Sequence, residues 1–414
     1  MKPPESKSIA LINRVCEADS VQVLTEGQRT STQEATKQVR VTLLGFYGRG
    51  NFGDDAMGRA LIRFLVEEPG VVVRILTSDP NVYAESAADV DIAEFSAPSV
   101  VRSALDSDVI CQGGGTHFHD SYTGIRIVRH WWSLLKWAGI FWLSRACGAK
   151  VVMVGAGVGP LRRGISRWIS GTALSACNSI CVRDQASAKL VRKLLHRVPC
   201  QLGFDLAALD APKSRSGIKP PGPTRSIAIC PCSLAEFSQG KHLDERYWAP
   251  LADALAILHR DSPIRVIFLC LFSGCSAVPD SAVARLIADR LPDGVPVEFR
   301  EYDGHLDEFF GEFSRDHAFL CSKYHSAVAA YLASRKFAVI AYNKKVMDFA
   351  DEIHLDADLR IQAHEPQPSD LWLRVLRRLL TQNGPCPATM PVEVAQTRAR
   401  QAALRVFDML PQRL

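Results

Sequence analysis

A lysine and a histidine stand close together in the segment LCSKYHSAVAAYLASRKFAVIAYNKK, which occupies residues 320–345. A strand-like apolar run precedes Lys323, and an alanine-rich run with helical spacing follows His325. The amino terminus of a helix carries unpaired N–H groups, so a cation beside it suits an anionic substrate group. Histidine titrates near neutral pH, and this placement predicts that His325 acts as a general acid or base. The alternative is that His325 has only a structural role.

Glycine-rich segments follow two strand-like runs in the first half of the chain. In GFYGRGNFGDDA (residues 45–56) the glycines allow a tight turn before a helix, but the lysine of a P-loop is absent. The two acids that follow suit a helix cap or sugar hydroxyls. In CQGGGTHFHDSY (111–122) three glycines indicate a close approach to the backbone, and the histidines with one acid form an incomplete metal site. We therefore expect a substrate loop and no metal.

Two further motifs follow the next strand-like runs. VGAGVGPLRR (154–163) ends in Arg162 and Arg163, which suit a phosphate or carboxylate, or are ordinary surface arginines. In VRDQAS (182–187) the pair Arg183–Asp184 is expected to cap a helix.

The composition is that of a globular protein of 414 residues, 47% of them apolar. The 49 Lys and Arg exceed the 44 Asp and Glu by only five, so we expect no nucleic-acid partner. Of the 12 cysteines, several lie in apolar strand-like runs and none forms a C-x-x-C pair. These features, together with an N-terminus lacking an apolar signal segment, predict reduced thiols and a cytoplasmic protein.

The most apolar stretch, residues 131–161, is interrupted by three basic residues and by a glycine-rich segment. An uninterrupted apolar span of ~20 residues is absent, so we expect no transmembrane helix and no stable membrane insertion. We also expect Trp131, Trp132 and Trp137 to be largely buried.

Short strand-like runs alternate with amphipathic helical runs along most of the chain, which predicts parallel sheets covered on both faces. The predicted strands are 40–45, 71–76, 108–112, 150–155, 178–184, 226–230, 264–270, 317–321 and 337–342. The proline-rich segment APKSRSGIKPPGPTR (211–225) interrupts this alternation and suits a linker. The fold class is therefore α/β, with two Rossmann-like domains facing each other across a cleft, followed by C-terminal helices. The helical run at 371–380 suits either a membrane surface or packing against a domain. The expected parts are a flexible extension (1–38), an N-terminal domain (39–210), the linker (211–225), a C-terminal domain (226–370) and the helices (371–414).

Taken in chain order, these motifs resemble the polysaccharide pyruvyl transferase family. The resemblance runs from about Val41 to Phe349. It rests on N-x-G-D-[DE]-A at 51–56, the GGG loop ending in Asp120, G-x-G-x-G-P-L at 155–161, V-R-D-x-x-S at 182–187, and the cation-x-His strand exit followed by A-V-I-A-Y-x-x-K.

The resemblance implies a GT-B-like fold and the transfer of pyruvate from phosphoenolpyruvate to hydroxyls of a saccharide or related acceptor, forming a ketal. It also implies that His325 is the general acid and that no metal and no cofactor besides this donor is needed. The implied donor-binding residues are Lys323, Arg162, Lys344 and Lys345. From their residue types and place in the first domain, the candidate acceptor-binding residues and loop are Asn51, Gly53, Asp54, Asp55, Gly113, Gly114, Gly115 and Asp120.

Lys323 departs from the family pattern, which usually has arginine at this place. Arginine binds a carboxylate or phosphate through two hydrogen bonds, whereas lysine offers a point charge, so the donor stays open. One alternative is a nucleotide-sugar-dependent glycosyltransferase of the GT-B fold, with an acid such as Glu301, Asp303 or Asp307 binding the ribose. The other is a binding relative without catalysis.

Overall fold

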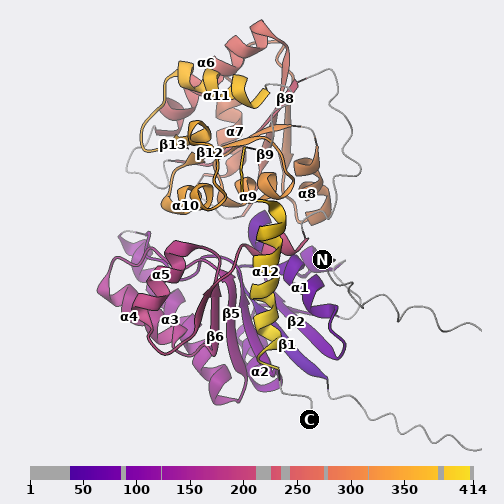
Figure 1. Cartoon of the computed structure of the whole chain (residues 1–414), viewed down its shortest axis with the longest axis vertical. Helices are drawn as coiled ribbons and strands as arrows, with labels where there is room; N and C mark the ends of the chain where they lie inside the picture. The colour runs from indigo at the N-terminus through magenta and orange to yellow at the C-terminus, as the bar shows by residue number, and fades with distance from the viewer. Residues whose placement is uncertain are drawn as a thin grey trace, which may run out of the picture. The chain divides into compact units, whose positions relative to one another are not determined.

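The computed structural model describes residues 38–84, 90–122, 124–210, 225–234, 243–274, 278–315, 317–380 and 387–410. The extension expected at 1–38 and the linker expected at 211–225 lie outside this part of the chain, except for their last residues. The described part contains two parallel β-sheets with helices on their faces, which confirms the α/β class (Figure 1).

The first sheet has seven strands in the order β3-β2-β1-β4-β5-β6-β7, and all neighbours are parallel. One face is covered by α2, α3, α4 and α5, and the other contributes to a core with α1 and α12. The strands are β1 (Val39–Leu44), β2 (Val71–Thr77), β3 (Asp91–Glu94), β4 (Val109–Gly113), β5 (Lys150–Ala156), β6 (Ser179–Val182) and β7 (Cys200–Leu202). The helices are α1 (Phe52–Val66), α2 (Ala97–Asp106), α3 (Ile125–Ala146), α4 (Gly164–Leu174) and α5 (Gln185–Leu194).

The second sheet has six parallel strands in the order β10-β9-β8-β11-β12-β13. Its strands are β8 (Arg225–Cys230), β9 (Ile264–Cys270), β10 (Val297–Glu301), β11 (Ala318–Cys321), β12 (Phe337–Ala341) and β13 (Arg360–Gln362). Its helices are α6 (Leu243–Asp261), α7 (Asp280–Ala288), α8 (Leu306–Ser314), α9 (Tyr324–Leu332), α10 (Lys344–Glu352) and α11 (Ser369–Leu380). The central strands are buried on both faces, as parallel strands between helix layers must be.

The strand order reverses once in each sheet, between β1 and β4 in the first and between β8 and β11 in the second. Open α/β sheets bind ligands at such switch points, beyond the carboxyl ends of the strands. The segment 45–56 follows β1, the GGG loop follows β4, and Lys323 with His325 follows β11. The topology therefore brings the motifs from the sequence to both switch points.

The loops after β1 and β9 hold the two switch-point edges together. The amide of Phe52 donates to the carbonyl of Leu271 (3.1 Å), and the amide of Ser273 donates to the carbonyl of Gly50 (3.0 Å). Nearby, an Arg59 guanidinium nitrogen lies 2.6 Å from a carboxylate oxygen of Asp307. The carboxyl edges of the two sheets consequently meet around the start of α1.

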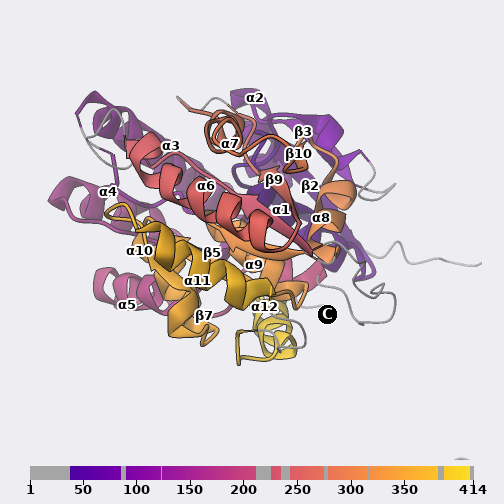
Figure 2. The same ribbon diagram turned by 90° about the horizontal axis from the view of Figure 1, so that it is seen from above.

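The two C-terminal helices pack on different sheets, as seen in Figures 1 and 2. Helix α11 packs on α6 and buries Trp372, Leu376 and Leu379, so it packs against a domain rather than lying on a membrane. Helix α12 (Val392–Phe407) returns to the first half and packs against β5 and β6. Its buried face consists largely of alanines, which permit a close approach to the sheet.

The expectation for the tryptophans is partly wrong. Trp137 is buried, but the side chain of Trp132 is 65% exposed and that of Trp131 is half-buried. The stretch forms the long helix α3, and successive residues of a helix point about 100° apart, so only one face can contact the sheet. None of the described helices is long and apolar enough to cross a membrane. The nine cysteines in the described residues are all free thiols.

Candidate active site

His325 lies against the first turn of α1, although it belongs to the other half of the chain. A Cβ atom added to Gly53 would lie 1.8 Å from the Nδ1 of His325, so only glycine leaves room for this imidazole. His325 is the second residue of α9, and Gly53 is the second residue of α1. The imidazole is therefore enclosed between two helix amino termini, where positive potential favours an anionic ligand.

Asp205 faces the other nitrogen of this histidine. Its carboxylate is fully buried and lies 3.6 Å from the Nε2 of His325, which is longer than a hydrogen bond. Burial alone would raise the pKa of Asp205, but His325 and Arg183 hold it below its usual range. Asp205 is thus a permanent negative charge that attracts and orients the imidazole.

Arg183 connects this carboxylate to the start of α9. One guanidinium nitrogen lies 3.3 Å from Asp205, and another donates to the hydroxyl of Thr116 (2.9 Å). The guanidinium carbon lies 4.0 Å from the ring centroid of Tyr324, the first residue of α9. Asp184 caps α5 by accepting from the amide of Ser187, as expected, whereas Arg183 mainly organises the site.

Asp54 and Lys345 interact electrostatically with the groups described above. We call His325, Asp205, Arg183, Asp54 and Lys345 together the cluster. Burial raises the pKa of Asp54, and His325, Arg183 and Lys345 oppose the rise. Enclosure by protein atoms lowers the pKa of Lys345 to about 8, and Arg183 adds to the lowering, while Asp54 opposes it. The residue Lys345 as a whole is nevertheless exposed to solvent. The cluster therefore combines cations with an opening through which an anion can enter.

The other two predicted donor-binding lysines are already paired with carboxylates. The Nζ of Lys323 lies 2.8 Å from Asp280 and 5.0 Å from the ring centroid of Phe272, at the edge of the cluster. Lys344 pairs with Asp348 one helical turn later, and its side chain is 78% exposed. Lys345 is the better placed member of the Lys344–Lys345 pair.

The predicted acceptor residues of the first motif divide into two groups. Asn51 caps α1 and donates to Asp54 (2.5 Å), so both side chains stay beside the cluster. Asp55 instead accepts from the amide of Gly48 (2.6 Å) and from the hydroxyl of Tyr302 in the second half (3.0 Å). Burial raises the pKa of Asp55 to about 7. Through these contacts Asp55 links the two halves of the chain, so its role is structural.

The GGG loop approaches α1 so closely that its glycines are required. Gly114 and Gly115 have φ angles of 69° and 72°, in the left-handed region that favours glycine. A Cβ on Gly115 would lie 2.9 Å from the Nε2 of His117 and 3.1 Å from Asp54. Gly113 accepts a hydrogen bond at its carbonyl from the hydroxyl of Tyr47 (2.6 Å). The loop thus carries His117 up to Asp54.

His117 and His119 are neutral at physiological pH. Burial lowers the pKa of His117 to about 4, with a further contribution from Arg49. Burial lowers the pKa of His119 to about 3, and His130 and Lys345 add to it. Among the described residues the buried Nε2 of His117 has no hydrogen-bond partner. Neutral imidazoles of this kind can exchange hydrogen bonds with sugar hydroxyls.

Asp120 anchors the loop after β5. One carboxylate oxygen accepts from the backbone amides of Arg162 (2.7 Å) and Arg163 (2.6 Å), just before α4. The Arg163 guanidinium also donates to the carbonyl of Asp120 (2.8 Å), whereas the side chain of Arg162 is exposed. Asp120 and Arg162 therefore belong to the loops next to the cluster, and neither is one of the charged groups of the cluster itself.

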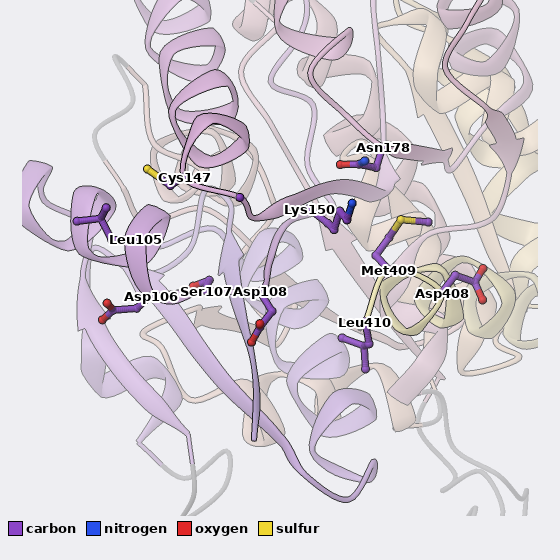
Figure 3. A pocket seen from close by; sticks show the side chains of 11 residues that line it. Leu105, Asp106, Ser107, Asp108, Cys147, Lys150, Asn178, Asp408, Met409 and Leu410 are labelled. Atoms are coloured by element: carbon purple, nitrogen blue, oxygen red, sulfur yellow. The ribbon is translucent and has the colours of Figure 1, made fainter. Parts of the chain in front are cut away.

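The described residues contain no group of three or more His, Cys, Asp or Glu arranged to hold a metal ion. A separate pocket lies at the amino ends of β4 and β5, the edge opposite the cluster (Figure 3). Its carboxylate Asp106 pairs with Arg74 and Arg102, and Asp108 accepts from the amide of Arg40. These polar groups are engaged in holding the sheet, and we assign the pocket no part in the chemistry.

Asp205 is the main site residue that the sequence analysis missed. It follows β7, a strand of only three residues, so no apolar run marked its position at a strand end. Its available signal was the sequence Gly-Phe-Asp, an acid two residues after a glycine in the segment GFDLAALD (203–210) before the linker.

Comparisons with known proteins agree with this architecture. A sequence model of the family "Polysaccharide pyruvyl transferase" matches residues 51–344, more than half of the chain. No curated protein matches the chain in sequence.

Solved structures share the fold at low sequence identity. A Listeria monocytogenes protein assigned as a UDP-N-acetylglucosamine 2-epimerase has a TM-score of 0.60 and 11% identity, covering 91% of this chain and 98% of its own. The S. aureus MnaA–UDP complex has a TM-score of 0.56 and 10% identity, covering 90% and 98%. A further UDP-N-acetylglucosamine 2-epimerase has a TM-score of 0.51 and 13% identity, covering 90% and 95%. The chain therefore has the GT-B-like fold of two Rossmann-like domains.

Proposed function

Because the chain belongs to the polysaccharide pyruvyl transferase family, a family of transferases, we propose that it transfers pyruvate from phosphoenolpyruvate to hydroxyls of a saccharide. The observation that carries this proposal is the enclosure of His325 between two helix amino termini, beside Asp205 and near the cations Arg183 and Lys345. A proton donor next to fixed positive charge is what an anionic enol phosphate requires.

In the proposed reaction His325 protonates the methylene carbon of phosphoenolpyruvate. The C=C electron pair forms the new C–H bond and leaves an oxocarbenium-like centre at the adjacent carbon. One acceptor hydroxyl attacks this centre and loses its proton to a base, and inorganic phosphate then departs with the C–O electron pair. A second hydroxyl attacks the resulting cation and gives its proton to the deprotonated imidazole of His325, which restores the acid and completes the ketal. Water must be excluded, since it would intercept either cation.

The charges of the cluster divide between donor and acceptor in this proposal. Lys345 binds the phosphate or carboxylate of the donor, and Lys323 adds a second cation from its pair with Asp280. Asp54 and the neutral His117 orient the acceptor hydroxyls from the first half. The reaction needs no metal or additional cofactor, and we propose that it takes place in the cytoplasm.

A ligand-shift melting experiment tests the choice of donor. At 100 times its dissociation constant, a ligand adds about 2.7 kcal/mol to the free energy of unfolding. We expect phosphoenolpyruvate to raise the melting temperature and UDP-sugars to leave it unchanged. Stabilisation by a UDP-sugar alone would favour the nucleotide-sugar glycosyltransferase, and stabilisation by neither would favour a binding relative.

The structure bears on one acid that the glycosyltransferase alternative would use for ribose. Asp307 is a poor ribose ligand, because it already pairs with Arg59 and Arg63.

Replacing Lys345 is expected to weaken donor binding and to change its pH dependence. A hydrogen bond to a charged group contributes about 1.5–3 kcal/mol, so Lys345→Met should raise the dissociation constant of phosphoenolpyruvate roughly 10–100-fold. The pKa of Lys345 is lowered to about 8, so the wild-type affinity should fall as the pH rises above this value. Calorimetric titrations between neutral and alkaline pH measure both effects.

Lys344→Met is the matched comparison, since the neighbouring ammonium pairs with Asp348. We expect a much smaller loss of affinity and an unchanged pH profile. An equal loss in both variants would contradict the assignment of Lys345.

Adding a methyl group to Gly53 is expected to displace His325 and lower turnover. The new Cβ would overlap the imidazole, and a misplacement of about 1 Å can cost roughly 100-fold in rate. Gly171→Ala in α4 is the control, because nothing lies within 4 Å of its added Cβ. Phosphate release from phosphoenolpyruvate with a polysaccharide acceptor is the assay. Full turnover in Gly53→Ala would show that the position of His325 is irrelevant to the reaction.

A further inference from the structure

Helix α3 exposes a row of large apolar side chains to solvent. Ile125, Val128, Trp132, Leu135 and Trp142 are all exposed and follow one another at intervals of three, four or seven residues. This spacing places them along one side of a helix, opposite the face that packs on the sheet. A globular protein gains nothing by presenting such a row to water, so the row suits an interaction.

Helix α4 continues this row beside α3. Trp168 is 69% exposed, and Ile165 is exposed one turn before it. The indole of Trp142 donates to the carbonyl of Thr172 (2.9 Å), and that of Trp131 donates to the hydroxyl of Ser166 (3.0 Å). These contacts hold the two helices side by side (Figures 1 and 2). We call the exposed sides of α3 and α4 the α3–α4 face.

The charged side chains on α3 and α4 themselves have a single sign. From Ser121 to Arg183 the sequence contains no Asp or Glu, although the chain has 44 acidic residues, and it contains nine Lys or Arg. Arg126, Arg129 and Lys136 are exposed on α3, and Arg167 is exposed on α4. On these two helices, exposed apolar side chains flanked by basic ones match a surface that is apolar inside and anionic at its rim.

We propose that the α3–α4 face docks on the surface of an anionic lipid bilayer. Trp132 and Trp168, the two most exposed tryptophans of the face, enter the boundary between headgroups and acyl chains, and the basic side chains contact lipid phosphates. Docking of this kind needs no transmembrane helix. A second copy of the chain fits the face less well, because a twofold contact would bring two basic surfaces together.

The face lies next to the candidate site along the chain. Helix α3 follows the GGG loop, and α4 follows the loop held by Asp120, so both helices begin at the switch-point edge of the first sheet. A bilayer bound to the α3–α4 face would lie beside the entrance to the site. The proposal stands without pyruvyl transfer, because it rests only on exposure and charge.

Cosedimentation of the full chain with lipid vesicles tests the proposal at physiological salt. We expect binding to vesicles that contain phosphatidylglycerol and little binding to phosphatidylcholine alone. The double variant Trp132→Ser/Trp168→Ser should bind at least about tenfold more weakly, since it removes the inserted apolar surface. Replacing Arg129 and Lys136 by glutamine should weaken binding about fivefold for each charge, and added salt should weaken the wild type further.

Leu404→Ser is the control, because Leu404 is an exposed apolar residue on α12, away from the face. It should bind vesicles like the wild type, and melting temperatures check that all variants are folded. Equal cosedimentation of the double tryptophan variant and the wild type would overturn the proposal, as would absence of wild-type binding to the anionic vesicles. Sedimentation velocity without lipid tests self-association. If the wild type is a dimer and Trp132→Ser is a monomer, the face is a contact between two copies of the chain and the lipid proposal is wrong.

Discussion

Replacement of His325 by alanine is expected to lower turnover about 10²–10⁴-fold, the usual cost of losing a general acid. The imidazole is the proton donor in the proposed reaction. It fits against Gly53 of α1, which has no side chain to displace it, and its Nε2 faces the carboxylate of Asp205. Donor binding should change little, since the cations Arg183 and Lys345 remain. Steady-state kinetics with phosphoenolpyruvate, combined with calorimetry for its affinity, separate the two quantities.

His325→Gln distinguishes proton transfer from packing, because glutamine fills much of the space and cannot act as the acid. We expect it to be as slow as the alanine variant. His196→Ala, at an exposed position after α5, is the control and should retain full turnover. Near wild-type turnover in His325→Gln would mean that another group supplies the proton.

Removal of Arg183 is expected to destabilise the fold by about 3–5 kcal/mol, the usual cost of leaving one member of a buried ion pair alone. Both side chains of the Arg183–Asp205 pair are almost fully buried, so water cannot replace the lost partner. Urea unfolding of Arg183→Met measures the loss. Arg102→Met, which breaks an exposed pair with Asp106, should change stability by no more than about 0.5 kcal/mol.

The double variant Arg183→Met/Asp205→Leu should lose less than the sum of its two single variants, because it leaves no unpaired charge. The pH dependence gives a second readout. The pKa of Asp205 lies below its usual range, so its stabilisation is present above the unfolded-state pKa of about 4 and is lost as the pH falls. Additive losses in the double variant would mean that the two side chains do not interact.

The strands that the sequence analysis found are the central ones of both sheets. The missed strands are β3, β7, β10 and β13, and these are the four edge strands. An edge strand has one neighbour and one half-exposed side, so its residues need not be apolar, and those of β3 (DIAE) are half acidic. The apolar run that identifies a strand in a sequence is a consequence of burial. Edge strands are less buried, so their runs are less apolar.

The same cause explains the missed Asp205, since it follows an edge strand. The wrong expectation for Trp132 has a different cause: hydrophobicity predicts burial on average, but the direction in which a residue points from its helix decides the individual case. Lys344 and Lys345 are equivalent in sequence and both are exposed, and only the geometry of α10 pairs Lys344 with Asp348 while placing Lys345 near Arg183 and Asp54.

From the amino-acid sequence alone we could predict the α/β alternation, the glycine loops at strand ends, the ordered motifs that resemble one family, and His325 as the candidate acid. These features depend on residues that are neighbours along the chain, where backbone geometry and side-chain period act directly. Three contacts arise only from the packing of the folded chain: Gly53 makes room for His325, Asp205 faces this imidazole, and Arg183 pairs with Asp205. These residues lie on different strands and in different halves, and their contacts depend on how two helix-covered sheets pack, which no local pattern encodes.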